Sequence, residues 1–272
     1  MDLQHENKIV TLIDNCVYGR VLKAEHGLSV YIEKDGNRIL FDTGASDQFI
    51  VNARLLHIDL KKVNYLILSH GHSDHTGGLK FFLEYNDHAR VICKPGVFVR
   101  KFKGERENGM TGIDEKYMSR FDFHETNFEL LPGLFVVAQL PIYDLRDTHF
   151  NCFELHKDGQ CIPDTFEDEL ALSIVSGDDM TVVSACSHRG ITNILRAIVE
   201  YLPGKHLKQV IGGYHIHLAG NEKSDVIASY FQNFPDCKIG VCHCSGVDQF
   251  ARFYSILGDR VFYNHVGLSC EI

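Results

Sequence analysis

The stretch Ser69-His70-Gly71-His72-Ser73-Asp74-His75-Thr76-Gly77-Gly78 follows an apolar run over residues 63–68. That run is typical of a buried strand, and the polar stretch after it holds three histidines and an aspartate in a single turn. Imidazole and carboxylate groups suit zinc, manganese or iron, and the small residues between them let the backbone fold closely around an ion. The stretch therefore predicts a metal site at a strand end. A polar loop that happens to be rich in histidine is the alternative.

His70, His72, Asp74 and His75 match without a gap the His-x-His-x-Asp-His signature of the metallo-β-lactamase superfamily, which this chain resembles. Flavodiiron proteins of the same fold usually have glutamate in place of the second histidine. Because residue 72 is histidine, the resemblance points to the hydrolase-type members. It implies that the protein is an enzyme, a metal-dependent hydrolase.

Composition limits the partners. The formal net charge of −9 over 272 residues argues against nucleic acid, because phosphate backbones are normally bound by a net basic surface. No stretch reaches the roughly 18 apolar residues of a membrane span, and the N-terminus lacks a signal-peptide core. Nine scattered cysteines favour buried thiols over disulfides. We expect a cytoplasmic protein that binds neither membrane nor nucleic acid.

Apolar segments alternate with segments of helical period, which favours the α/β class. Residues 28–34 and 38–42 flank Asp35-Gly36-Asn37, a hairpin signal. Helices are predicted over residues 47–57, 78–85, 191–202, 224–233 and 247–257, and later strands over residues 207–212, 238–242 and 260–263.

The later half of the chain repeats the earlier one. Residues 170–184 align without a gap under residues 28–42, and in both halves a helix then leads to another strand. That strand ends in His70-Gly71-His72 in one half and in His215-Ile216-His217 in the other. Low identity leaves chance similarity as the alternative. If the halves pack sheet to sheet, both histidine pairs meet at one edge, and the resemblance implies the same four-layer αββα sandwich in a single domain over residues 1–272.

Residues 96–167 break this pattern and are predicted to be an insertion. The polar run over residues 101–109 is typical of a mobile loop. The insertion could be a lid over the site or a solvated excursion. The exposed stretch Phe121-Asp122-Phe123 could mark a homodimer surface or lie buried under the insertion.

Four ligands in one turn cannot all reach the same ion, which favours a site with two divalent metals. The resemblance implies that His70 and His72 bind one ion and that Asp74 and His75 bind the other, with zinc preferred over manganese or iron. His188, before a predicted helix, is a further expected ligand, with a structural role as the alternative.

His215 is preferred over His217 as another ligand because it follows the strand directly. Cys186 stands where superfamily members often have a bridging aspartate, so either it approaches the metals as a thiolate or water alone bridges them. In the superfamily an aspartate at the place of Asp42 usually orients a ligand histidine. A turn-capping aspartate is the alternative.

Three local sequences narrow the resemblance to the branch of 7,8-dihydropterin-6-methyl-4-(β-D-ribofuranosyl)aminobenzene 5'-phosphate synthase and its bacterial relatives: Cys186-Ser187-His188-Arg189-Gly190-Ile191, Gly212-Gly213-Tyr214-His215 and His243-Cys244-Ser245-Gly246. We expect a metal-dependent hydrolase or related synthase in which a metal-bound hydroxide attacks a small, phosphorylated, pterin- or nucleotide-like substrate. The alternative is a catalytically silent metal-dependent sensor.

Roles in this reaction follow from residue type and position. Asp74 would hold a metal and the nucleophile's proton, and His243 could protonate the leaving group or merely be packed. Helix N-termini at Gly190-Ile191 and Ser245-Gly246 could bind the phosphate. We therefore expect substrate binding by Arg189, Tyr214 and Ser245, with the ring of Tyr214 or of a phenylalanine in the insertion stacking on the substrate.

Overall fold

The chain divides into two units, each with its own seven-stranded sheet among the described residues. The computed structural model describes residues 7–157, 159–217 and 220–272. Unit 1 comprises Met1–His124, Cys152–Ile162 and His265–Ile272, and unit 2 comprises Glu125–Asn151 and Pro163–Asn264. The one domain expected over residues 1–272 stays a prediction.

The sheet of unit 1 holds an antiparallel hairpin, with two more antiparallel strands on one side of it and parallel strands on the other. The hairpin turns at Asp35 and Gly36, whose φ angles of 50° and 81° suit the left-handed turn that Asp-Gly favours. In spatial order the strands are β18 (Ser269–Glu271), β1 (Lys8–Ile13), β2 (Ser29–Lys34), β3 (Asn37–Phe41), β4 (Tyr65–Ile67), β5 (Arg90–Cys93) and β8 (Phe121–Phe123).

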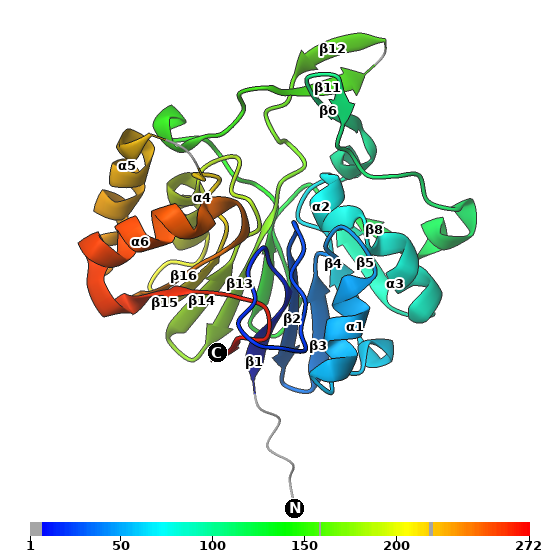
Figure 1. The fold of residues 1–272 in the computed structure, drawn as a ribbon, viewed down its shortest axis with the longest axis horizontal. Helices are drawn as coiled ribbons and strands as arrows, with labels where there is room; N and C mark the ends of the chain where they lie inside the picture. Colours follow the sequence, from blue (N-terminus) through cyan, green and yellow to red (C-terminus); the bar gives the residue numbers. More distant parts are fainter. Residues whose placement is uncertain (1–6, 158, 218–219) are drawn as a thin grey trace, which may run out of the picture. The chain divides into compact units, whose positions relative to one another are not determined.

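Helices α1 (Gln48–Leu55) and α3 (Leu79–Tyr85) lie along one face of this sheet (Figure 1). Phe49 of α1 and Phe82 of α3 are fully buried in one cluster with Leu66 of β4. The short helix α2 (Ser73–Thr76) lies within the histidine-rich stretch, and three 3-10 helices complete the unit: η1 (Leu60–Lys62), η2 (Pro95–Phe98) and η3 (Glu115–Arg120).

Unit 2 repeats the strand pairing of unit 1, which confirms the α/β class and the two similar halves. In spatial order its strands are β9 (Phe128–Leu131), β10 (Leu134–Val137), β13 (Ala171–Ser176), β14 (Asp179–Val183), β15 (His206–Gly212), β16 (Lys238–Val241) and β17 (Val261–Tyr263). The backbone N–H of Asp42 donates to Ile67 after the first hairpin, and that of Ser184 donates to Ile211 after the second, both at 2.9 Å.

The helices of unit 2 lie beside its sheet (Figure 1). Residues Ile194 of α4, Phe231 of α5 and Phe253 of α6 are fully buried in one cluster with the strands. The helices are α4 (Ile191–Tyr201), α5 (Asn221–Phe231), α6 (Gly246–Leu257), η4 (Leu145–Asp147), η5 (His243–Ser245) and η6 (Gly258–Arg260). None of the helices in the described part of the chain has the length and apolar character that a membrane span requires.

The segment 96–167 contributes more to the sheets than the sequence indicates, because β8, β9 and β10 belong to them. The expected mobile loop over residues 101–109 is wrong, since this run forms a hairpin that turns at Gly104, with Phe102 buried on the inner side. A third sheet has the order β12 (Gln160–Pro163), β11 (Phe153–Lys157), β6 (Arg100–Lys103) and β7 (Arg106–Glu107). A lid function stays a prediction.

Candidate functional site

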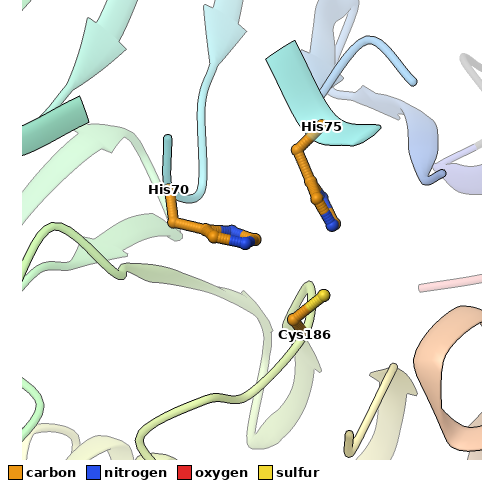
Figure 2. Close-up of side chains that lie close together, drawn as sticks. All are labelled: His70, His75 and Cys186. Atoms are coloured by element: carbon orange, nitrogen blue, oxygen red, sulfur yellow. The ribbon is translucent and has the colours of Figure 1, made fainter. Parts of the chain in front are cut away.

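In unit 1 the loop after β4 carries His70 and His72, and helix α2 carries Asp74 and His75. All three imidazoles are buried, and the ring centroid of His70 lies 4.8 Å from that of His72 and 4.3 Å from that of His75. Figure 2 shows His70 and His75 converging from the loop and the helix. The Asp74 carboxylate, 20% exposed, lies with Oδ2 3.7 Å from Nε2 of His75. The structure therefore brings together the four groups of the opening motif.

Asp42 determines which way two of these imidazoles point their nitrogens. Its Oδ2 lies 2.8 Å from Nδ1 of His75 and accepts the Ser69 hydroxyl at 2.6 Å. Because that hydroxyl has one hydrogen, its oxygen is left to accept from Nδ1 of His70, 2.9 Å away. Both histidines thus carry their hydrogen on Nδ1 and present the lone pair of Nε2, the form in which a neutral imidazole binds a metal.

Electrostatics support the same protonation state for His70. Burial, together with the neighbouring His75 and His72, holds the pKa of His70 well below its usual value. A neutral imidazole is the species that coordinates a divalent ion. Three imidazoles and one carboxylate are a donor set that fits zinc, manganese or iron.

In unit 2, His188 lies in the loop that joins β14 to α4. The buried carboxylate of Glu169 accepts the backbone N–H groups of His188 and Arg189, both at 2.8 Å, and burial raises its pKa to about 7. Nδ1 of His188 faces the carbonyl oxygen of His149 at 3.1 Å, so it donates and leaves Nε2 as the acceptor. The ring of Phe166 stacks on that of His188 at 3.6 Å. The loop therefore fixes the imidazole of His188 from several sides.

His215 lies beside His188, with ring centroids 4.3 Å apart, and its backbone has the left-handed φ of 46°. His217 instead pairs with Asp248 at 3.1 Å, and both side chains are exposed. This arrangement favours His215 as the ligand. Sequence analysis missed His149, whose ring stacks on that of His215 at 4.0 Å. As an isolated histidine outside any strand-end motif, it carried no recognisable signal.

Cys186 is the cysteine at the start of the same loop (Figure 2). The Sγ atom of Cys186 lies within 4.8 Å of a ring nitrogen of His188 and of a ring nitrogen of His215. Cys186, His243 and Cys244 form a second group whose ligand atoms lie within the same distance of one another. Cys186 therefore lies within reach of an ion held by either group. The catalytic role of His243 stays a prediction, since the same position also suits a ligand. Sequence analysis assigned no role to Cys244.

The residues expected to bind substrate are engaged within unit 2. Arg189 donates to the carbonyl oxygens of Leu140 and Thr165, both at 2.7 Å. Ser245 accepts the backbone N–H of Tyr214 at 2.9 Å. The expectation that the ring of Tyr214 stacks on a substrate is wrong, because this side chain is fully buried in the core. For Arg189 and Ser245, substrate binding stays a prediction.

The N-terminus of α4, where a phosphate was expected, already has an anion. Oδ2 of Asp147 accepts the backbone N–H of Thr192 at 2.6 Å. Gly190 has φ +93°, and a Cβ there would lie 2.8 Å from the same oxygen. The first turn of α4 is therefore capped by the chain itself.

Comparison with known proteins identifies the family of this chain. The model of the metallo-beta-lactamase superfamily matches residues 22–149. A solved structure described as a metal-dependent hydrolase of the beta-lactamase superfamily has a TM-score of 0.84 and 30% identity, covering 98% of this chain and 99% of that one. The chain belongs to the metallo-β-lactamase superfamily and has its fold.

Two relatives come from Methanocaldococcus jannaschii. The 7,8-dihydropterin-6-methyl-4-(β-D-ribofuranosyl)-aminobenzene-5'-phosphate synthase is 32% identical over 259 residues, which cover 88% of this chain and 87% of that protein. An uncharacterized protein is 31% identical over 268 residues, covering 95% and 98%. The branch that the sequence motifs indicate is thus among the similar proteins.

Proposed function

We propose that this protein is a metal-dependent enzyme, a hydrolase or related synthase, that acts on a small phosphorylated molecule. The observation that carries the proposal is the buried group His70, His72 and His75. Ser69 and Asp42 hold the hydrogens of His70 and His75 on Nδ1, so both rings present the lone pair of Nε2. A buried cluster of imidazoles beside a carboxylate loses hydration that apolar residues at the same positions would not lose. It is, however, the donor set of a divalent metal.

The expected ligands remain His70, His72, Asp74 and His75 in unit 1, with His188 and His215 in unit 2, for two ions of which zinc is preferred. Bound divalent ions supply Lewis-acid activation of water and of the bond under attack. Asp74 is suited to hold a proton of the attacking water, because its carboxylate is partly exposed.

Two observations support a phosphorylated substrate: the name of one relative and the position of the Lys101 side chain. The 32% identical synthase is named for a 5'-phosphate product. In this chain Lys101 is buried, with 1% exposure, instead of solvated as a loop lysine would be. A Cβ at Gly71, beside His70, would lie 3.0 Å from Cε of Lys101. A cation held at that place favours an anionic substrate.

A silent metal-dependent sensor is the second candidate. It is favoured by Cys186, since a thiolate ligand in place of a bridging carboxylate would reduce the Lewis acidity of an ion. Metal loading without turnover of any substrate would support it.

The test is metal content per chain on protein purified without chelator, for wild type, His70→Ala and His188→Ala. We expect about two equivalents for wild type, as in two-metal hydrolases, and losses in both variants. Wild-type protein is then screened against carboxylic esters, lactones, and phosphate mono- and diesters. Loaded protein that turns over no ester, lactone or phosphate ester would contradict the enzyme and leave the sensor.

A further inference from the structure

We propose that His26 is a positioning residue for Asp74, and that Asn15 sets the imidazole tautomer that His26 uses. His26 belongs to the loop between β1 and β2, outside every motif considered above. Its Nε2 lies 3.3 Å from Oδ2 of Asp74, and its Nδ1 lies 3.2 Å from the amide nitrogen of Asn15. The inference rests on the proposed role of Asp74 as a metal ligand.

The direction of these hydrogen bonds follows from a backbone group that can only donate. The N–H of Gly27 donates to Oδ1 of Asn15 at 3.2 Å, which identifies the oxygen of that amide. The amide NH2 of Asn15 therefore faces His26, so Nδ1 of His26 must accept. The hydrogen of the neutral ring is then on Nε2, where it is donated to the carboxylate of Asp74.

The same loop also holds the backbone of Asp74. The N–H of Leu28 donates to the carbonyl oxygen of Asp74 at 3.2 Å. This approach requires glycine at the preceding position, because a Cβ on Gly27 would lie 2.5 Å from that oxygen. The loop thus contacts both the backbone carbonyl and the carboxylate of Asp74. Together these contacts hold the turn of α2 that carries Asp74 and the rotamer of its side chain.

Such an arrangement has a specific consequence for metal binding. A carboxylate oxygen has two lone pairs, so Oδ2 of Asp74 can accept from His26 and still face Nε2 of His75. Hydrogen bonds that orient a ligand typically account for 10- to 100-fold in metal affinity. The side chain of His26 is itself 72% exposed, so its loss removes little buried surface.

The experiment compares zinc affinity, by competition with a chelator, in wild type, His26→Phe and His26→Gln. Phenylalanine keeps the ring but cannot donate, whereas glutamine can place an amide N–H near the position of Nε2. We expect the dissociation constant of the more weakly bound of the two zinc ions to be about 10- to 100-fold higher in His26→Phe than in wild type. We expect His26→Gln to stay near wild type, with the zinc-free proteins melting at the same temperature.

A second measurement tests the tautomer without any metal. In a long-range ¹H–¹⁵N spectrum of zinc-free protein, the signal of His26 is identified by its absence in His26→Phe. We expect it to show a hydrogen on Nε2 and none on Nδ1. Asn15→Ala should abolish this preference.

Unchanged zinc affinity in His26→Phe, or equal losses in His26→Phe and His26→Gln, would overturn the role of His26 while leaving the metal enzyme intact. A bare Nε2 in the wild-type spectrum would overturn the role of Asn15. Wild-type protein that binds no zinc would instead overturn the proposed function, and this inference with it.

Discussion

Asp42 lies 33 residues before the histidine that it contacts, and its backbone has the left-handed φ of 60°. This conformation is costly for most residues and persists only where the surroundings hold it. Here it turns the carboxylate toward the backbone N–H of Ser69 at 2.7 Å, the Ser69 hydroxyl and Nδ1 of His75. One carboxylate therefore orients two candidate ligands.

We expect Asp42→Asn to weaken zinc binding about 10- to 100-fold. Asparagine tolerates the left-handed backbone, so the change acts on the hydrogen bonds and not on the fold of the turn. If its NH2 group takes the place of Oδ2, Nδ1 of His75 can no longer donate to it. If it takes the place of Oδ1, it opposes the backbone N–H of Ser69, which is also a donor. Chelator competition measures the effect. Asp87→Asn, at a fully exposed carboxylate, is the control, and equal affinities of Asp42→Asn and wild type would contradict the orienting role.

At the scale of the element, α4 begins where Asp147 accepts the N–H of Thr192. The side chain of Asp147 is fully buried, and burial raises its pKa from 3.8 to about 6. The positive end of the helix dipole favours the ionised form of Asp147, whereas burial away from water disfavours that form. The stability of this helix start therefore depends on pH.

We expect the free energy of unfolding to fall as pH rises from about 4 to 6, by up to about 3 kcal/mol from this group. The sign follows because the folded carboxyl keeps its proton in a range where the unfolded one has lost it. Asp147→Asn cannot ionise and should lack this component. Urea unfolding of both proteins at several pH values, without metal, measures the difference. Parallel pH profiles would contradict the raised pKa.

At the scale of the whole molecule, each unit has a buried apolar cluster of its own and a set of histidines in a loop after a strand. Buried imidazoles without a metal lose hydration and gain little. A metal that binds only the folded chain adds stability by mass action. The metal-loaded protein should therefore be more stable than the metal-free one.

We expect EDTA to lower the melting temperature of the purified protein, since zinc at a thousandfold excess over its Kd contributes about 4 kcal/mol. His70→Ala should respond less to EDTA than wild type. His88→Ala, which changes an exposed histidine, should respond like wild type. Calorimetry measures all three, and a melting temperature unaffected by EDTA would contradict a structural contribution from metal.

Elements were predictable wherever a local pattern decides them. The helix expected over residues 191–202 is α4 (Ile191–Tyr201), and the hairpin around Asp35 and Gly36 formed as its turn residues indicate. Prediction failed at residues 101–109, because the polar run hides two buried side chains, those of Lys101 and Phe102. Tyr214 followed a strand end as expected, but its side chain turned into the core. Binding partners, cellular location and the homodimer stay predictions.

The sequence by itself determined the α/β class, the repeated halves and the four candidate ligands within one turn, because each depends on residues close together in the chain. Only the tertiary structure decided which nitrogen His70, His75 and His188 present, that His149 and Cys244 lie near the expected ligands, and that Asp147 caps α4. These features join residues far apart in sequence, such as Asp42 with His75 and Asp147 with Thr192, which are 33 and 45 positions apart. Their geometry depends on how the strands align, and no local pattern specifies that alignment.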